Sequence, residues 1–192
     1  MRELMRSALN RRGGGGKTPL SPRAVWVLLA VAALVWWLQP APLRSPGSRG
    51  GGGGVIEGHA RVIDGDSVVV AGREMRLQGI DAPEGRQHCT RGGADWACGE
   101  EARRHLQSLI GGRPLTCRAD ESDQHGRLLS VCEVAGNVIN GRSLNAAMVD
   151  DGFAVAYGRY RSEEQRARSA RRGLWSGEFQ QPREWRDQHP RP

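Results

Sequence analysis

Three short runs rich in β-branched residues, separated by glycine-containing turns, constrain the fold of this chain more than any other feature. They cover residues 55–63, 66–71 and 74–80. Val and Ile side chains fit the pleated surface of a sheet, and glycine between such runs is typical of hairpin turns. We therefore expect three consecutive strands, with the first hairpin turning at Ala71-Gly72-Arg73 so that Val70 faces Glu74.

The segments that follow predict a mixture of helices and strands. A helix is expected over residues 99–112, which carry an apolar stripe, two glutamates in the first turn and two glycines at the end. Residues 114–120 and 127–134 should form a second hairpin, and residues 143–152 and 162–173 two further helices. This order predicts an α+β fold, or a small β-barrel with helices at one end.

The positive charge of the chain lies outside the predicted fold. The formal net charge is +7, but residues 1–54 hold eight basic residues and one acidic residue, whereas the remainder holds 20 of each. The overall charge therefore does not indicate a nucleic-acid-binding surface on the folded part. Phosphate binding there would need a few arginines at specific positions.

Residues 24–38 form an uncharged apolar run that ends in tryptophans, as membrane anchors often do. A helix of this length spans about 22 Å, which is short of the roughly 30 Å hydrocarbon core. An uncleaved anchor over residues 24–39 is the favoured interpretation, and a signal peptide or a buried core helix are the alternatives. Because basic residues precede the run, the N-terminus is expected in the cytoplasm and the rest of the chain outside it. In a bacterium this is the periplasm, and cleavage would yield a secreted protein.

No protein partner is predicted, and a monomer is expected. This interpretation divides the chain into five parts, of which one is a folded domain. They are a basic cytoplasmic segment (1–23), a transmembrane anchor (24–39), a Gly/Pro/Ser-rich linker (40–54), the folded domain (55–178) and a polar C-terminal tail (179–192). The linker composition cannot bury a core and is typical of a flexible tether.

Four cysteines, Cys89, Cys98, Cys117 and Cys132, all lie in the part expected to be exported. An even number of cysteines in an oxidising compartment favours disulfides. Zinc binding is disfavoured because no CxxC motif occurs, and free buried thiols are another alternative. If the second hairpin turns near residues 124–125, Cys117 lies almost opposite Cys132, within disulfide reach. Cys89 and Cys98 would then close a Gly- and Arg-rich loop.

Acidic residues cluster at the ends of the predicted strands. Asp66 precedes one strand, Asp81 follows another, and the proline after Ala82 directs Glu84 onto a loop. We expect the three carboxylates and the Ala82 carbonyl to converge at one edge of the sheet. Calcium takes oxygen ligands of this kind, and Arg76, predicted on the same face as Asp66, adds a planar fork suited to phosphate.

For any one of these residues, a solvated turn or an ordinary ion pair is the simpler interpretation. Their combination favours a site. A second acidic turn, SDQHGR at residues 122–127, again leads into an arginine at the start of a strand, Arg127.

Six stretches carry a resemblance to a known family: VIDGDSVVV, RLQGIDAPE, CGEEA, DQHGR, NAAMVDDGFAVAY and RRGLWS, in this order between about residues 58 and 176. In these motifs the chain resembles the thermonuclease, or staphylococcal-nuclease-like, family. The resemblance implies a five-stranded OB-type β-barrel with three helices. It also implies a calcium-dependent endonuclease that hydrolyses phosphodiester bonds of DNA or RNA and leaves 3′-phosphate and 5′-hydroxyl ends.

The resemblance also assigns roles to individual residues. Three positions belong to the Ca2+ site: Asp66, Asp81 and the main-chain carbonyl of Ala82. Asp64, the outer acidic residue of the DGD turn, either reaches the outer shell of the metal or only shapes the turn. Glu84 is the general base or orients the attacking water, and Arg76 and Arg127 bind the phosphate. Tyr157 and His125 lie where the family contacts the nucleotide, although His125 replaces a usual tyrosine and Tyr157 could instead be a half-buried structural residue.

Three hypotheses about function remain at this stage. The first is the nuclease, and the second is a catalytically silent OB-type module that only binds nucleic acid. The third is a protein that uses this fold for a ligand other than nucleic acid. The nuclease is favoured because a binding module has no need for Asp66, Asp81 and Glu84 together with both arginines.

Overall fold

The computed structural model describes residues 54–136 and 139–190. The predicted cytoplasmic segment and membrane anchor lie outside these residues, and so does the predicted linker except for its last residue, Gly54, which begins the first strand. Within the part that the structure describes, no helix combines the length and the apolar character needed to span a bilayer.

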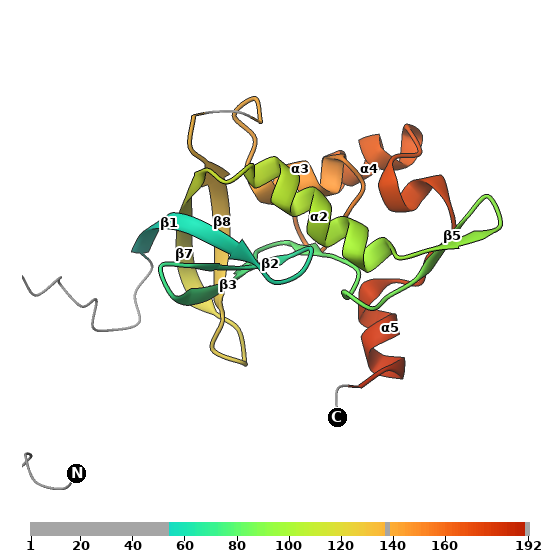
Figure 1. Cartoon of the computed structure of the whole chain (residues 1–192), viewed down its shortest axis with the longest axis horizontal. Helices are drawn as coiled ribbons and strands as arrows, with labels where there is room; N and C mark the ends of the chain where they lie inside the picture. Colours follow the sequence, from blue (N-terminus) through green and yellow to red (C-terminus); the bar gives the residue numbers. More distant parts are fainter. Residues whose placement is uncertain (1–53, 137–138, 191–192) are drawn as a thin grey trace, which may run out of the picture. The chain divides into compact units, whose positions relative to one another are not determined.

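Five strands form a closed barrel, as the resemblance implied (Figure 1). They are β1 (Gly54–Val62), β2 (Ser67–Val70), β3 (Arg73–Leu77), β7 (Pro114–Ser122) and β8 (Leu128–Val134). β1 pairs antiparallel with β2 and β7, and β7 pairs antiparallel with β8. A parallel pairing of β3 with β8 closes the ring. Closure leaves none of these five strands as a free edge.

Alternation of apolar and polar residues explains which faces of the strands fill the barrel. Val68, Val70, Met75 and Leu77 are buried, whereas Glu74 between them is exposed. Side chains on successive strand positions point to opposite faces, so every second residue enters the core. These residues share one core cluster with apolar side chains of the helices beside the barrel.

The first hairpin turns one residue earlier than predicted. Val70 pairs with Arg73 rather than with Glu74, so the turn consists of Ala71 and Gly72 alone. Both adopt a positive φ, 49° and 76°, as a two-residue type I′ turn requires. The prediction was wrong because alanine seldom adopts this conformation, whereas the twist of the two strands favours it.

Four α-helices lie in the described residues, one more than predicted: α2 (Cys98–Ile110), α3 (Leu144–Asp150), α4 (Arg161–Ser169) and α5 (Pro182–Gln188). α2 packs against β1 and α3, and α3 also packs against β8 and α4 (Figure 1). α5 is the additional helix and lies in the segment read as a polar tail. It begins with Pro182, which suits the first turn of a helix because that position needs no N–H donor.

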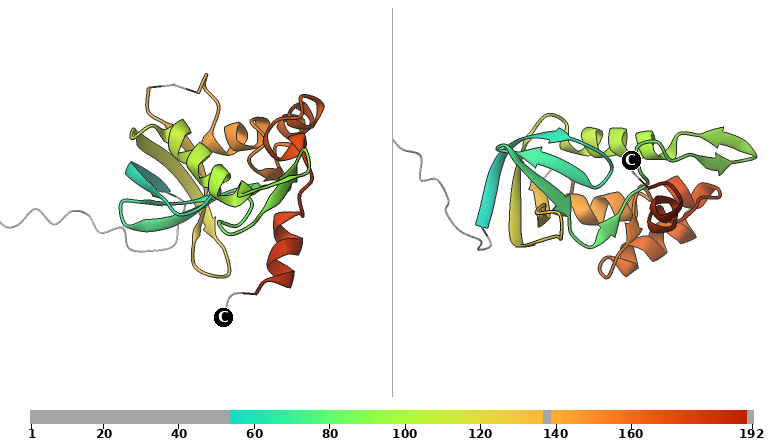
Figure 2. Two further views of the ribbon diagram at one scale, coloured as in Figure 1. Left: turned by 45° about the vertical axis from the view of Figure 1, so that its right-hand side comes forward. Right: turned by 90° about the horizontal axis from the view of Figure 1, so that it is seen from below.

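Smaller elements shape the chain between the barrel and these helices. β4 (Ile80–Asp81) pairs with β9 (Val155–Ala156), and a single 3-10 turn covers Gly173–Ser176. β5 (Cys89–Arg91) and β6 (Ala94–Trp96) form a hairpin where the sequence predicted only a loop. This hairpin extends away from the barrel in the right-hand view of Figure 2.

Both predicted disulfides are present, and they account for all four cysteines. Cys117 and Cys132 are direct partners across β7 and β8, with their Cα atoms 4.1 Å apart. Cys89 and Cys98 join β5 to the first residue of α2. The zinc and free-thiol alternatives are therefore wrong.

Candidate active site

The first hairpin and β4 bring Asp66, Asp81 and Arg76 together, as expected from the sequence. Arg76 lies on β3, Asp66 immediately before β2, and Asp81 at the end of β4. One nitrogen of Arg76, Nη2, lies 2.9 Å from Asp66 Oδ2 and 2.7 Å from Asp81 Oδ1. The shorter turn pairs Arg76 with Ser67, the residue after Asp66. The contact between Arg76 and Asp66 therefore arises at the strand ends, and not from the shared strand face that the sequence predicted.

Asp66 is a buried carboxylate with only 3% of its surface exposed. Its Oδ1 accepts a hydrogen bond from Ser67 Oγ (3.0 Å), and its Oδ2 accepts one from the Ala82 amide (3.1 Å). Burial raises the pKa of Asp66 to about 6; Arg76 opposes the rise, and the negative charge of Asp64 adds to it. The protein groups alone therefore stabilise the ionised form poorly.

Asp81 is 5% exposed, and burial raises its pKa as well. The charge of Asp66 adds to this rise, whereas hydrogen bonding and charge from Arg186 and Arg76 reduce it. Two adjacent buried carboxylates with raised pKa values form a place where an additional positive charge would be stabilised.

Asp64 shapes the turn between β1 and β2. Its Oδ1 accepts a hydrogen bond from the Asp66 amide at 3.1 Å, a side-chain-to-backbone bond two residues along that is typical of aspartate in turns. Gly65 between them has no room for a Cβ atom, which would overlap the side chains of Ala82 and Ala102. The DGD turn is thereby packed against both the loop after β4 and α2.

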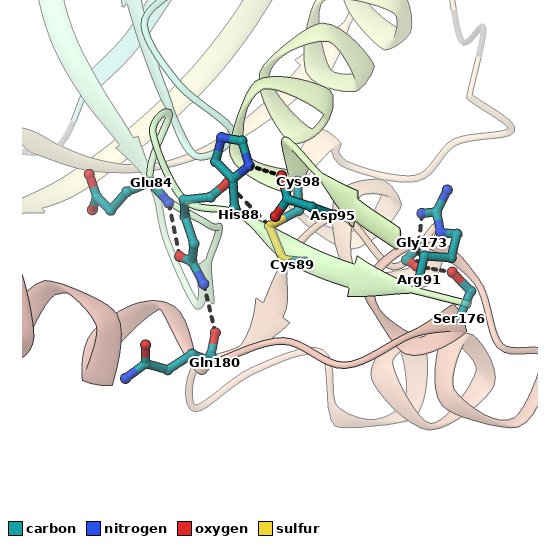
Figure 3. The surroundings of a disulfide bond; sticks show 10 residues. Glu84, His88, Cys89, Arg91, Asp95, Cys98, Gly173, Ser176 and Gln180 are labelled. Atoms are coloured by element: carbon teal, nitrogen blue, oxygen red, sulfur yellow. Dashed lines mark hydrogen bonds and ion pairs between the residues drawn. A yellow bond between two sulfur atoms is a disulfide. The ribbon is translucent and has the colours of Figure 1, made fainter. Parts of the chain in front are cut away.

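Glu84 lies on the loop after β4, and a buried glutamine fixes this loop. The Glu84 amide donates to Gln87 Oε1 (3.3 Å), the Gln87 amide donates to the Glu84 carbonyl (2.7 Å), and Gln87 Nε2 donates to the Gln180 carbonyl (2.7 Å). Figure 3 shows Glu84 and Gln180 on either side of this bridge. A Cβ atom on Gly99, at the start of α2, would collide with the Glu84 carbonyl. Gln87 and Gly99 thus position Glu84, and the sequence analysis missed both roles.

Arg186 on α5 is a further site residue that the sequence analysis missed. Its Nη1 and Nη2 donate to the two oxygens of Asp81 at 2.9 and 3.0 Å, and Nη1 also lies 3.2 Å from Glu84 Oε1. Burial opposes ionisation of this guanidinium, but Asp81 and Glu84 outweigh it, so the pKa of Arg186 is raised. The only sequence signal was an arginine in a short segment that begins with proline, PREWR.

Arg127 and His125 lie in the turn between β7 and β8, where Asp123 organises the chain. Asp123 Oδ2 accepts from Arg127 Nε (2.8 Å), and Asp123 Oδ1 accepts from the His125 and Arg127 amides (2.9 and 3.0 Å). Although burial raises it, the pKa of Asp123 is lowered overall by these bonds. Leu129 pairs with Arg76 across the parallel strands, and Arg127 lies two residues earlier, directly before β8 begins.

Tyr157 follows β9, and its amide donates to the Gly79 carbonyl at 2.8 Å. The residue is 62% exposed, which does not fit the half-buried structural interpretation. An exposed aromatic ring of this kind suits contact with a ligand.

The donor chemistry of the site fits a hard divalent cation. Asp66, Asp81 and Glu84 supply carboxylate oxygens, which Ca2+ prefers, and the first two converge on one nitrogen atom of Arg76. Within the described ranges, no three His, Cys, Asp or Glu side chains are already spaced to hold a metal ion.

Residues 74–177 match the family model described as staphylococcal nuclease homologue. The succinoglycan biosynthesis protein ExoI of Rhizobium meliloti is 35% identical over 127 residues, which cover 62% of this chain and 64% of that protein. Protein ParB of Escherichia coli is 36% identical over 143 residues, covering 66% and 76%. The micrococcal nuclease of Shigella flexneri is 34% identical over 143 residues, covering 66% and 77%.

Proposed function

The chain belongs to the staphylococcal nuclease homologue family, and on this premise we propose that it is a hydrolytic nuclease acting on phosphodiester bonds of DNA, RNA or both. The observation that carries the proposal is the buried pair Asp66 and Asp81, bridged by Arg76, with Glu84 beside it. The relative named micrococcal nuclease supports the same reaction class.

We propose Ca2+ as the cofactor, held by the carboxylates of Asp66 and Asp81 and by the Ala82 carbonyl. When bound, a divalent cation there supplies charge stabilisation for a phosphodiester under attack. The raised pKa values of both aspartates support this choice, because a cation would offset the cost of burying two negative charges. Asp64 would support the site by holding the turn that carries Asp66.

Glu84 is proposed to take a proton from the attacking water, and Arg76 to bind the non-bridging phosphate oxygens. Proton transfer by a positioned carboxylate and charge stabilisation by a fixed guanidinium are separate contributions to rate. Arg127, directly before β8, would add a second guanidinium, and Tyr157 and His125 would contact the nucleotide. By the family resemblance, the bond to the 5′ oxygen breaks, leaving 3′-phosphate and 5′-hydroxyl ends.

We further propose that the domain is exported and acts as a monomer, tethered by residues 24–39 or released by cleavage. The two disulfides support export, because such bonds persist in oxidising compartments and are rare in the cytosol.

The test is digestion of plasmid DNA and of an RNA by the full-length chain in detergent, with Ca2+ or with chelator. We expect cleavage only with Ca2+, and a loss of about 10²- to 10⁴-fold in rate for Glu84→Gln with nucleic-acid binding retained. Glu74→Gln, which makes the same change at an exposed position of β3, is the matched control and should cleave normally.

Equal cleavage in chelator would refute the role of the cation, and equal cleavage by Glu84→Gln would refute the role of that residue. Binding of nucleic acid without cleavage under any condition would instead identify the chain as the catalytically silent module.

A further inference from the structure

We propose that Arg186 is an internal counter-cation of the active site. Without a bound metal ion, its guanidinium pairs with the carboxylate of Asp81, and a divalent cation binds there only by displacing this guanidinium. The inference rests on the proposed function for the identity of the cation, Ca2+. It concerns the C-terminal helix α5, whose residue Arg186 reaches into the carboxylate cluster from far along the chain.

The first argument is the hydrogen-bonding capacity of Asp81. Its Oδ1 accepts from Arg76 Nη2 at 2.7 Å and from Arg186 Nη1 at 2.9 Å, and its Oδ2 accepts from Arg186 Nη2 at 3.0 Å. A carboxylate offers about four lone-pair positions, of which these bonds use three. One position remains, so a cation that takes both oxygens of Asp81 as ligands competes directly with Arg186.

The second argument is charge. Three carboxylates, those of Asp66, Asp81 and Glu84, face two guanidiniums, those of Arg76 and Arg186. Removing Arg186 changes the net charge of this group of five from −1 to −2, which is equal and opposite to the charge of one divalent cation. Keeping it would place a fixed positive charge beside the incoming ion, and that repulsion is strong where water is largely excluded.

The third argument concerns which of the two arginines can leave. Arg76 is held on a barrel strand between two carboxylates, and its side chain is 19% exposed. Arg186 lies on a helix of seven residues at the edge of the domain, and its side chain is 34% exposed. An isolated helix of this length is not stable, so α5 depends on its contacts with the domain.

Contacts other than the Arg186 pairs also hold α5 against the domain. Pro182 is buried, and Arg86 lies 5.5 Å from the centre of the Trp185 ring and donates to the His189 carbonyl at 3.4 Å. Release of Asp81 would therefore free the side chain of Arg186 without disturbing the barrel.

A different role for Arg186, the positioning of Asp81 and Glu84 for the cation, predicts the opposite result. If Arg186 positions these carboxylates, its removal weakens cation binding; if it competes, its removal strengthens binding. The sign of the change in affinity therefore decides between the two roles.

The experiment is calorimetric titration of the full-length protein in detergent with CaCl2 at fixed ionic strength. We expect Arg186→Gln to bind Ca2+ more tightly than the unaltered protein by about tenfold or more, because a nearby positive charge has been removed. Arg183→Gln removes the same charge from an exposed position of the same helix and should bind Ca2+ like the unaltered protein. Asp81→Asn should abolish the measured binding, which assigns it to this site.

An unchanged or weaker affinity of Arg186→Gln would overturn the proposal. If that variant does not fold, Arg186→Lys replaces it, because lysine keeps the charge but cannot engage both oxygens of Asp81 as a planar fork. Its affinity should exceed that of the unaltered protein, and an equal or lower value would refute competition. If Arg186→Gln binds Ca2+ more tightly but the unaltered protein has no nuclease activity, only the proposed function is refuted. If the unaltered protein is a nuclease but Arg186→Gln binds Ca2+ with unchanged affinity, only this inference is refuted.

Discussion

The single residue Asp66 lowers the stability of the folded domain, because its ionised carboxylate is buried in the candidate site. Its carboxylate is buried, and its pKa of about 6 lies well above that of an exposed aspartate. An exchange of this carboxylate for a neutral group should therefore stabilise the cation-free fold at neutral pH. A residue that destabilises its own domain is one of the physical signatures of a binding or catalytic site.

The pH dependence of unfolding tests this argument. Because the pKa of Asp66 is raised on folding, its contribution to stability is greatest below about pH 4 and is lost as the pH rises through about 6. Asp66→Asn does not titrate. We expect the difference in free energy of unfolding between Asp66→Asn and the unaltered protein, both in chelator, to change in favour of the variant as the pH rises from about 4 to about 6. The change should be at most about 1.4 kcal/mol per pH unit, and the difference should be constant above about pH 6.

Denaturant unfolding at a series of pH values gives this comparison directly. Asp120→Asn, which makes the same change at an exposed position of β7, is the matched control. A difference for Asp66→Asn that does not vary with pH would contradict the assignment.

Single residues of the candidate site were predictable where a local motif carries them. The DGD turn and the IDAPE segment place Asp66, Asp81 and Glu84 near one another through short-range chain geometry alone. Arg186 could not be found in this way, because it is 105 residues from Asp81 in the sequence and reaches it only through the packing of α5. Gln87 escaped notice for a similar reason, since its partner Gln180 lies in a distant segment.

At the scale of elements, the contact between the start of α2 and the loop that carries Glu84 controls the geometry of the site. Gly99 opens the helix directly against the Glu84 carbonyl, and its amide donates to the Gln87 carbonyl at 3.2 Å. In an exposed helix, a change of glycine to alanine is stabilising by up to about 1 kcal/mol. Here the added methyl group has no room, so close packing overrides the helix propensity.

Gly99→Ala should therefore destabilise the domain by about 1–3 kcal/mol and lower the nuclease rate, because the loop with Glu84 must move. Gly85→Ala is the matched control: it adds a methyl group one residue after Glu84, in open space, at a position without a positive φ. Thermal melts and initial cleavage rates of the two variants provide the comparison. Normal activity in Gly99→Ala would show that the contact does not position Glu84.

Elements with a strong internal pattern were predicted, and those that depend on distant contacts were not. The five barrel strands and the helices α2 and α3 carry clear periodicity, whereas the helix α4 was predicted from helix-start and helix-stop residues. α5 has the sequence PREWRDQ, with one aromatic residue and no apolar stripe, so only its contacts with the domain explain it. The register of the first hairpin depended on Ala71 adopting a positive φ, which sequence preference argues against.

At the scale of the whole molecule, the two disulfides serve different regions. Cys117–Cys132 joins β7 and β8 inside the barrel, far along the chain from Glu84. Cys89–Cys98 joins β5 to the first turn of α2, next to Gly99 and the loop that carries Glu84 (Figure 3). We therefore expect Cys117–Cys132 to stabilise the fold alone, and Cys89–Cys98 to stabilise both the fold and the position of Glu84.

Alanine replacement of each pair separates these roles. Both variants should lose about 3 kcal/mol in free energy of unfolding, since each bond closes a short loop of the unfolded chain. Below the unfolding transition, the variant without Cys117–Cys132 should keep its nuclease rate, whereas the variant without Cys89–Cys98 should lose most of it. Urea titrations and initial rates measure both quantities, and an equal loss of rate in the two variants would argue against this division.

The parallel pairing of β3 with β8 determines when the barrel can close during synthesis of the chain. A ribosome completes β3 early, but the partner strand that closes the barrel emerges only after the long intervening segment that holds α2 and β7. Pairings between such distant segments form late, because the entropy of closing the loop must be overcome first. A chain that degrades nucleic acid, as we propose, would therefore stay inactive during synthesis until β8 has emerged and paired with β3.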